Sequence, residues 1–145
     1  MIKSFIRNCI VFFARRWGLP DPSLVIFKSD YPDGKLVGEP AQIGAFSVID
    51  YGGGVFIGKN VKIGYGVIIL SVSTITGSKN NIVLKKPVYI GDDAEIGSNV
   101  VVLPGVKIGK NATIGAGAVV TENVPDDSVA VGMPAHIVRI KSDIL

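Results

Sequence analysis

The chain has 145 residues, a net charge of +3 and a pI near 9.0, which indicates a single, mildly basic domain. Because its lysines and arginines are dispersed and mostly not interleaved with aromatic residues, the composition argues against nucleic-acid binding. The single cysteine, Cys9, excludes an internal disulfide and fits a reducing, cytoplasmic setting. Glycine is abundant, with 18 residues, and this excess needs a backbone explanation.

Residues 1–18 contain the only long helical pattern. Apolar residues recur there at three- and four-residue spacing: Ile2, Phe5, Ile6, Cys9, Phe13 and Trp17. The uncharged run from Asn8 to Ala14 is too short to span a bilayer. Two interpretations stay open for this short amphipathic helix. It packs on the chain's own oligomer, or it lies on the inner membrane surface as a peripheral contact.

A six-residue repeat dominates the second half of the chain. Its first place is branched and apolar without a break: Ile90, Ile96, Val102, Ile108, Ile114 and Val120. Its fifth place is small or branched and apolar: Ala94, Val100, Val106, Ala112, Ala118 and Val124. Apolar places that are alternately four and two residues apart do not form a sustained helical stripe. They suit short strands joined by tight corners.

The fourth place of the repeat identifies the corner. It reads Asp93, Asn99, Gly105, Asn111, Gly117 and Asn123, the residue types that best tolerate a positive φ. At Pro104-Gly105, proline and glycine stand where a type II turn requires them. Each hexapeptide is therefore predicted to be a short strand plus a turn. Three of them close a triangular coil that buries the first and fifth places.

The same repeat appears upstream with interruptions. Its first places there are Ile57, Ile63 and Ile69, with a weaker start at Ile43 and Ile49 and a resumption at Leu84. We therefore predict an all-β fold, a parallel β-helix over residues 43–125 with a protruding loop at about 75–83. The N-terminal helix and an irregular segment occupy residues 1–42, and a fold-back segment occupies residues 126–145.

The segment from about Lys85 to Ile140 resembles the hexapeptide-repeat acyltransferases, in particular the sugar and polysaccharide O-acetyltransferases of the maltose and galactoside type. The stretches KPVYIGD, LPGVKIG, IGAGAVVT and GMPAHIV carry the resemblance. It implies a left-handed β-helix, although parallel crossovers are normally right-handed. It also implies a homotrimer, with acetyl-CoA between neighbouring subunits and a sugar or nucleotide-sugar as acceptor. No metal is expected, because a zinc site of the β-helix type needs several histidines and the chain has one.

The resemblance also implies where the cofactor lies. Its residues carry over to a wall along the pantetheine arm and to the adenosine end: Gly97, Ala116 and Gly117, then Thr121, Pro134, Ala135 and Arg139. For these residues a purely structural role stays open, since Gly97 and Gly117 are also turn glycines. One charge is reversed, because Glu122 stands where relatives often have lysine.

The resemblance implies a histidine general base just before the KPV segment, since an imidazole has a pKa near neutrality. The corresponding stretch, LSVSTITGSKNNIVLKKPV, contains Ser73 and Thr74 but no histidine. The only histidine, His136, falls at the distal end of the implied cofactor site. Glu95 stands where relatives often have tryptophan, and a carboxylate can act as a base if its pKa is raised.

These substitutes are the candidate catalytic residues: Glu95, Ser73 and Thr74, with Asp92 and Asp93 as further carboxylates that are more easily read as corner residues. Two functions stay open. One is an acyl-CoA-dependent O- or N-acetyltransferase acting on a sugar in polysaccharide or lipopolysaccharide biosynthesis. The other is a non-catalytic hexapeptide-repeat scaffold, a degenerate relative without the catalytic histidine.

Overall fold

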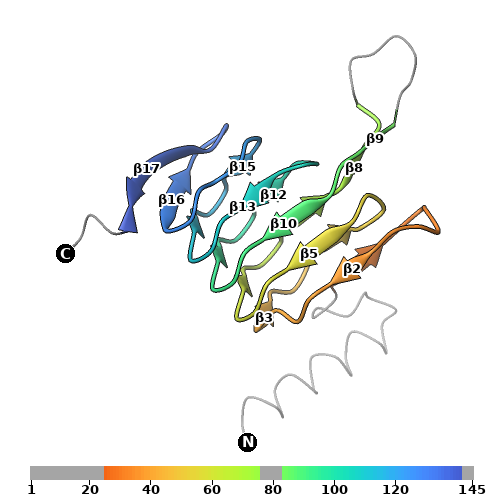
Figure 1. The fold of residues 1–145 in the computed structure, drawn as a ribbon, viewed down its shortest axis with the longest axis horizontal. Coiled ribbons are helices and arrows are strands. Elements are labelled where there is room, and N and C mark those ends of the chain that lie inside the picture. The colour runs from red at the N-terminus through yellow and green to blue at the C-terminus, as the bar shows by residue number, and fades with distance from the viewer. Residues whose placement is uncertain (1–24, 76–82, 142–145) are drawn as a thin grey trace, which may run out of the picture.

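The computed structural model describes residues 25–75 and 83–141, and over these ranges the chain is a β-helix of short strands (Figure 1). The strands are β1 (Ile26–Lys28), β2 (Leu36–Val37), β3 (Gln42–Ile43), β4 (Val48–Asp50), β5 (Val55–Ile57), β6 (Lys62–Ile63), β7 (Ile68–Leu70), β8 (Val72–Ser73), β9 (Leu84–Lys85), β10 (Val88–Ile90), β11 (Glu95–Ile96), β12 (Val101–Val102), β13 (Lys107–Ile108), β14 (Thr113–Ile114), β15 (Val119–Val120), β16 (Ser128–Val131) and β17 (His136–Ile140).

Three sheets form the faces of a prism. The first face has the order β1-β4-β7-β12-β15, the second β13-β10-β5-β2, and the third β17-β16-β14-β11-β6-β3. Every pair of strands in these sheets is parallel except β16 and β17. In Figure 1 the front strands run downwards while successive coils advance from right to left, so the helix is left-handed. The predicted all-β fold class is confirmed.

The core is the column of first and fifth places inside the prism. From Ile57 to Val124 these side chains expose at most 7% of their surface, except for Leu84, which is half-buried. Like residues stack on each other, since Ile63, Ile96 and Ile114 occupy the same register on the third face. The predicted burial of both places is confirmed except at Ile43 and Leu84, which are half-buried.

The corners use the positive φ that the fourth place predicted. Asp93 has φ +59°, Asn99 +58° and Asn111 +53°, and Gly105 after Pro104 has +87°. Asn123 is an exception, and the prediction for it was wrong, because it is not among the residues with positive φ. Its side-chain oxygen accepts a hydrogen bond of 2.8 Å from the Lys107 amide instead. Beyond Asn123 the second face ends in the isolated bridge between Ile108 and Val124.

The β-helix begins earlier than the repeat indicated. Residues up to 42 were predicted to be helical or irregular, but β1, β2 and β3 form a first coil that pairs with β4, β5 and β6. This coil escaped the repeat analysis because a long turn between Lys28 and Leu36 breaks the six-residue spacing. The predicted N-terminal helix lies outside the described residues.

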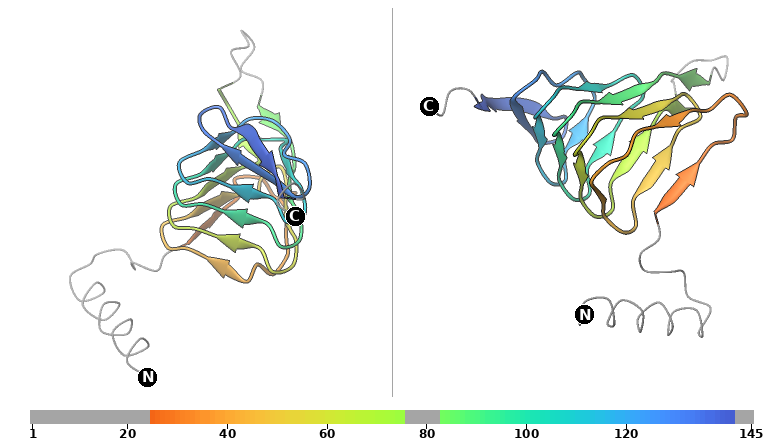
Figure 2. Two further views of the ribbon diagram at one scale, coloured as in Figure 1. Left: turned by 90° about the vertical axis from the view of Figure 1, so that its left-hand side faces the viewer. Right: turned by 60° about the horizontal axis from the view of Figure 1, so that its bottom comes forward.

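The corner between the first and second faces carries two further irregularities. Gly52, Gly53 and Gly54 turn the second coil, and in the third coil β8 pairs with β9 in antiparallel fashion. This hairpin projects from the prism in Figure 1 and in the left-hand view of Figure 2. At the C-terminal end, β17 returns antiparallel to β16 and closes the third face. Among the described residues no helix is long and apolar enough to cross a membrane.

Candidate functional site

The third face carries a shallow hollow of about 270 Å³. Its lining includes two predicted site residues, Glu95 and Gly97, together with Lys62 from the preceding coil and Thr113 from the next one. The outward side chains of this face alternate with the buried isoleucines, as expected for a sheet with one face in the core. The structure therefore brings the candidate base Glu95 next to the predicted cofactor wall.

Glu95 forms an ion pair across the coils. The Lys62 ammonium donates a hydrogen bond of 3.0 Å to its carboxylate, and the two side chains remain 62% and 49% exposed. The hydrogen bond and the charge of Lys62 lower the pKa of Glu95 below its ordinary value. Glu95 was expected to act as a base only if its pKa were raised. Within this chain the pKa is lowered instead, because the carboxylate is exposed and paired with a lysine.

The corner between the third and first faces carries different side chains at the two ends of the prism. In the fourth coil it is made of Ala116 and Gly117, and a side chain at Gly97 would clash with the Ala116 backbone nitrogen at 2.5 Å. Gly117 has φ +72° and open space around it. In the first two coils the same corner carries aromatic side chains, Phe46 and Tyr65, which are 62% and 60% exposed. The predicted cofactor wall is thus the small-residue part of one continuous corner.

The remaining predicted cofactor residues lie at the C-terminal end. The Ala135 amide donates a hydrogen bond of 2.9 Å to the Val119 carbonyl, so Pro134 and Ala135 sit above the corner that contains Gly117. Arg139 lies on β17, opposite Val129. Thr121 follows the other end of β15, on the far side of the first face from Gly117. One chain alone therefore does not bring Thr121 to the same corner.

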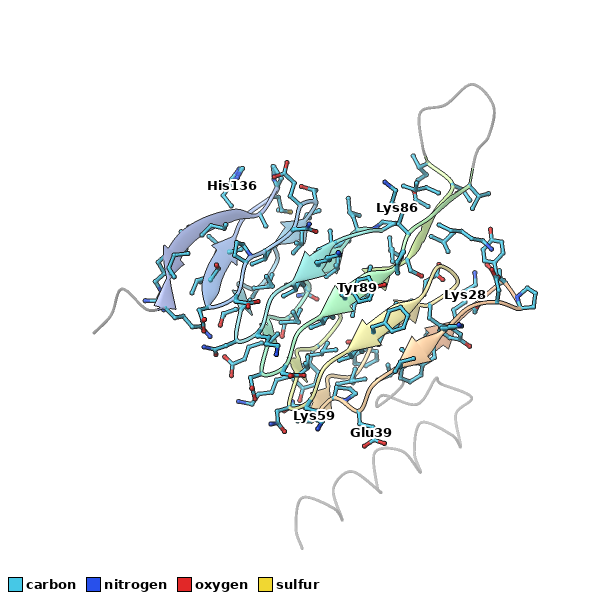
Figure 3. The ribbon with its side chains drawn as sticks, viewed as in Figure 1. Lys28, Glu39, Lys59, Lys86, Tyr89 and His136 are labelled. Carbon is cyan, nitrogen blue, oxygen red and sulfur yellow. The ribbon has the colours of Figure 1, made fainter. Side chains whose placement is uncertain are left out.

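Ser73 and Thr74 lie at a different corner from Glu95. Ser73 belongs to β8, at the corner between the first and second faces, and Thr74 follows it directly. Glu95 lies beyond β10, across the full width of the second face. The structure does not bring these candidates together within one chain. His136 is exposed at the C-terminal end of the prism (Figure 3), away from the hairpin that carries Ser73.

Several nearby polar residues have structural roles. The buried Ser71 hydroxyl accepts from the Gly53 amide at 2.9 Å and donates to the Asp50 carbonyl at 2.6 Å. Asp92 accepts a hydrogen bond of 2.9 Å from the Lys59 amide, and Asp93 accepts one from the Asn60 side chain. Both aspartates therefore serve the corner between the second and third faces. Among the described residues no three or more His, Cys, Asp or Glu side chains gather as metal ligands.

A second hollow, which the sequence analysis missed, lies on the second face beside the hairpin. Its volume is about 240 Å³, and it is lined by Asp33, Lys35, Gly52, Gly53, Gly54, Phe56, Lys85, Pro87 and Tyr89. Phe56 and Tyr89 stack with their ring centroids 4.9 Å apart and their planes 10° from parallel. Tyr89 lies in the middle of the front face in Figure 3, between Lys86 and Lys59 at the two corners. The sequence did contain a signal for this aromatic pair, because Phe56 and Tyr89 each directly precede an isoleucine at the first place of the repeat.

Comparisons with known proteins agree with this architecture. The model of the bacterial transferase hexapeptide (six repeats) matches residues 87–122, and the model of the hexapeptide repeat of succinyl-transferase matches residues 36–71. A galactoside O-acetyltransferase from Escherichia coli (strain K12) is 32% identical over 130 residues, covering 74% of this chain and 64% of the relative. A serine acetyltransferase from Staphylococcus xylosus is 40% identical over 99 residues, covering 68% of this chain and 45% of the relative.

Solved structures give the same result. A maltose O-acetyltransferase from Clostridium difficile 630 matches with a TM-score of 0.65 and 30% identity, over 81% of this chain and 63% of that chain. A galactoside acetyltransferase in complex with coenzyme A matches with a TM-score of 0.59 and 28% identity, over 82% and 65%. The chain spans between 32% and 64% of the length of the curated relatives it matches.

Proposed function

We propose that this chain, which belongs to the hexapeptide-repeat acetyltransferases, transfers an acetyl group from acetyl-CoA to a hydroxyl or amino group of a sugar acceptor, in polysaccharide or lipopolysaccharide biosynthesis. One observation carries the proposal. Gly97, which lines the hollow together with Glu95, lies directly against the Ala116 backbone of the small-residue corner that also contains Gly117. Such a run of residues with little or no side chain suits a long, thin donor, and a similar structure is one of a galactoside acetyltransferase in complex with coenzyme A.

The donor would follow the corner between the third and first faces. Gly97, Ala116 and Gly117 leave the backbone accessible, so that the pantetheine amides can hydrogen-bond to it. Open space beside Gly117 supports this use of the corner. Pro134, Ala135 and the Arg139 guanidinium at the C-terminal end would then lie along the adenosine part, where arginine suits phosphate recognition.

We also propose a homotrimer, because one outward row of the first face is apolar in every coil. Its outward places hold Ile26, Val48, Ile68, Val101 and Val119, in register across all five coils. The inward places of the same strands are buried aliphatic residues such as Ile69 and Val102. The row beside it is polar at Lys28 and Asp50. Apolar residues on the outward as well as the inward side of a sheet are typical of sheets covered on both sides. A second copy of the chain is the occupant we propose for this face.

In the trimer, the proposed chemistry needs groups from two copies. The acceptor oxygen or nitrogen attacks the thioester carbonyl, the carbon–sulfur bond breaks, and the acceptor's proton ends on the CoA thiolate. Glu95 is the proposed base, which requires that the bound donor or the neighbouring copy separate its carboxylate from Lys62 and desolvate it, so that its pKa rises. Ser73 and Thr74 from the hairpin of a neighbouring copy would orient the acceptor hydroxyl. Positioning can carry much of the rate, since general base catalysis typically contributes only about 10²–10⁴-fold.

The alternative function is a non-catalytic scaffold. Two observations favour it: the hairpin segment lacks the histidine that the resemblance implies, and the Glu95 carboxylate is paired with Lys62 at 3.0 Å. The two proposals differ in turnover. We expect purified protein to release CoA from acetyl-CoA in the presence of simple sugars, as measured with a thiol reagent, and Glu95→Gln to lower this rate about 10²-fold. If CoA and acetyl-CoA bind but no acceptor from a panel of sugars and amines supports the release of CoA, the protein is a non-catalytic scaffold.

A further inference from the structure

We propose that the hollow on the second face holds the acceptor and selects a sugar ring that bears a carboxylate or a phosphate. This inference rests on the proposed acetyl transfer and adds the chemical class of the acceptor. Three observations carry it: the aromatic stack, the charges around it, and its position beside the hairpin.

The aromatic stack supplies the surface for a sugar ring. Phe56 and Tyr89 come from neighbouring coils, and Tyr89 exposes 40% of its surface. Pro87 and the three glycines line the hollow beside the stack, and charged residues complete its lining. The C–H groups on one face of a pyranose are apolar, so covering them with an aromatic surface is favourable, while the hydroxyls remain in water or reach polar groups.

The charges around the stack favour an anion. Within the lining, the Lys85 ammonium lies 3.4 Å from the Asp33 carboxylate and 3.4 Å from the centroid of the Tyr31 ring, so its charge is already matched. Lys35 makes neither an ion pair nor a cation–π contact with any described residue. It is the cation of the hollow that remains available to a ligand carboxylate or phosphate.

A further lysine reinforces this potential from the other side. The Lys107 ammonium lies 5.7 Å from the centroid of the Tyr89 ring, in the coil that follows. Lys35 and Lys107 therefore lie on opposite sides of the aromatic pair, three coil spacings or roughly 14 Å apart along the prism axis at about 4.8 Å per strand. Lys35 is also offset along the strand, because Val37 is the residue in register with Phe56. A sugar ring seated on the stack would have a positive charge on either side.

The hollow lies next to the proposed catalytic hairpin. Lys85, one of its lining residues, belongs to β9 and pairs with Val72, and β8 continues to Ser73. A sugar on the aromatic stack would thus have its hydroxyls close to the segment where the proposed function puts acceptor orientation. Asp33 adds a carboxylate that can accept hydrogen bonds from sugar hydroxyls.

The experiment compares three probes, methyl glucuronide, glucose 1-phosphate and neutral methyl glucoside, by saturation-transfer NMR and calorimetry on the full chain. We expect at least one anionic probe to bind about 3- to 10-fold more tightly than methyl glucoside, with a difference that shrinks as salt is raised. Lys35→Ala should remove this preference without weakening methyl glucoside. Tyr89→Ala should weaken anionic and neutral probes alike, by about 2- to 10-fold.

Lys59→Ala is the matched control, because Lys59 is an exposed lysine at the opposite edge of the same face and its only hydrogen bonds among described residues involve the backbone. Equal affinity for all three probes, or the same loss in Lys35→Ala and Lys59→Ala, would overturn the inference. Acetyl-CoA binding is measured in parallel. If acetyl-CoA binds and the sugar preference is absent, the acceptor assignment fails alone, whereas loss of acetyl-CoA binding removes the proposed function itself.

Discussion

Ile108→Ala tests the stacked core most sharply. Ile108 exposes 2% of its surface and lies between Ile90 of the preceding coil and Val124 of the next one. The substitution removes three carbon groups, which at about 0.8 kcal/mol each represents roughly 2.4 kcal/mol of lost transfer free energy. A cavity contribution adds to this if the neighbouring residues cannot close in.

The backbone limits how far this site can collapse. The Gly91 amide donates to the Ile108 carbonyl at 2.8 Å, and the Gly109 amide donates to the Val124 carbonyl at 2.8 Å. Because these bonds hold the coils at a fixed spacing, most of the cavity should remain. We therefore expect a loss of about 3–5 kcal/mol in the free energy of unfolding, in the upper part of the range for large-to-small core changes.

Urea-induced unfolding followed by circular dichroism measures this loss. The protein concentration is held constant, because association would make the stability depend on concentration. Lys107→Ala is the control on the same strand, since its side chain points outward and its amide bond to Asn123 is retained; it should change the stability by less than about 0.5 kcal/mol. A loss below about 1 kcal/mol for Ile108→Ala, or equal losses for both variants, would refute the stacked-core account.

Two further predictions concern the corners and the ion pair. Asn99→Ala should cost about 1 kcal/mol because alanine is strained at φ +58°, whereas Asn99→Gly should be nearly neutral; urea unfolding of both variants checks this, and equal losses would contradict it. The lowered pKa of Glu95 means that its pair with Lys62 stabilises the fold above the unfolded carboxyl pKa, near 4.5, and that this contribution disappears as the pH falls through the folded pKa. Lys62→Ala should therefore destabilise the protein by less than about 1 kcal/mol at pH 7 and by nothing measurable near pH 2, and a constant difference across this range would contradict the assignment.

The sequence predicted the parts of the fold that depend on local repetition. From Ile90 to Val120 each coil repeats the same buried places, so the register follows from spacing alone. The first coil could not be predicted in this way. Its strands carry exposed residues such as Phe27 and Val37 at the open end of the prism, and a long turn separates β1 from β2. Without buried places at six-residue spacing, no periodic signal remains.

The candidate site was only partly predictable for a related reason. Glu95 and Lys62 are 33 residues apart, because the hairpin of the third coil adds residues to the regular repeat. The spacing therefore gave no indication that a lysine would pair with the candidate base. The same insertion separates Phe56 from Tyr89, whose stacking appears only once the coils are aligned across the hairpin.

Calorimetric titration of the purified full chain with acetyl-CoA and with free CoA tests the central claim most directly. The account predicts saturable binding of both, with one site per chain, and a clear loss of affinity in Gly117→Trp, which fills the open space at the corner between the third and first faces. Unfolding of Gly117→Trp by urea, compared with Gly117→Ala, separates a blocked site from backbone strain at φ +72°. If neither acetyl-CoA nor CoA binds at millimolar concentration, the acetyltransferase account is contradicted.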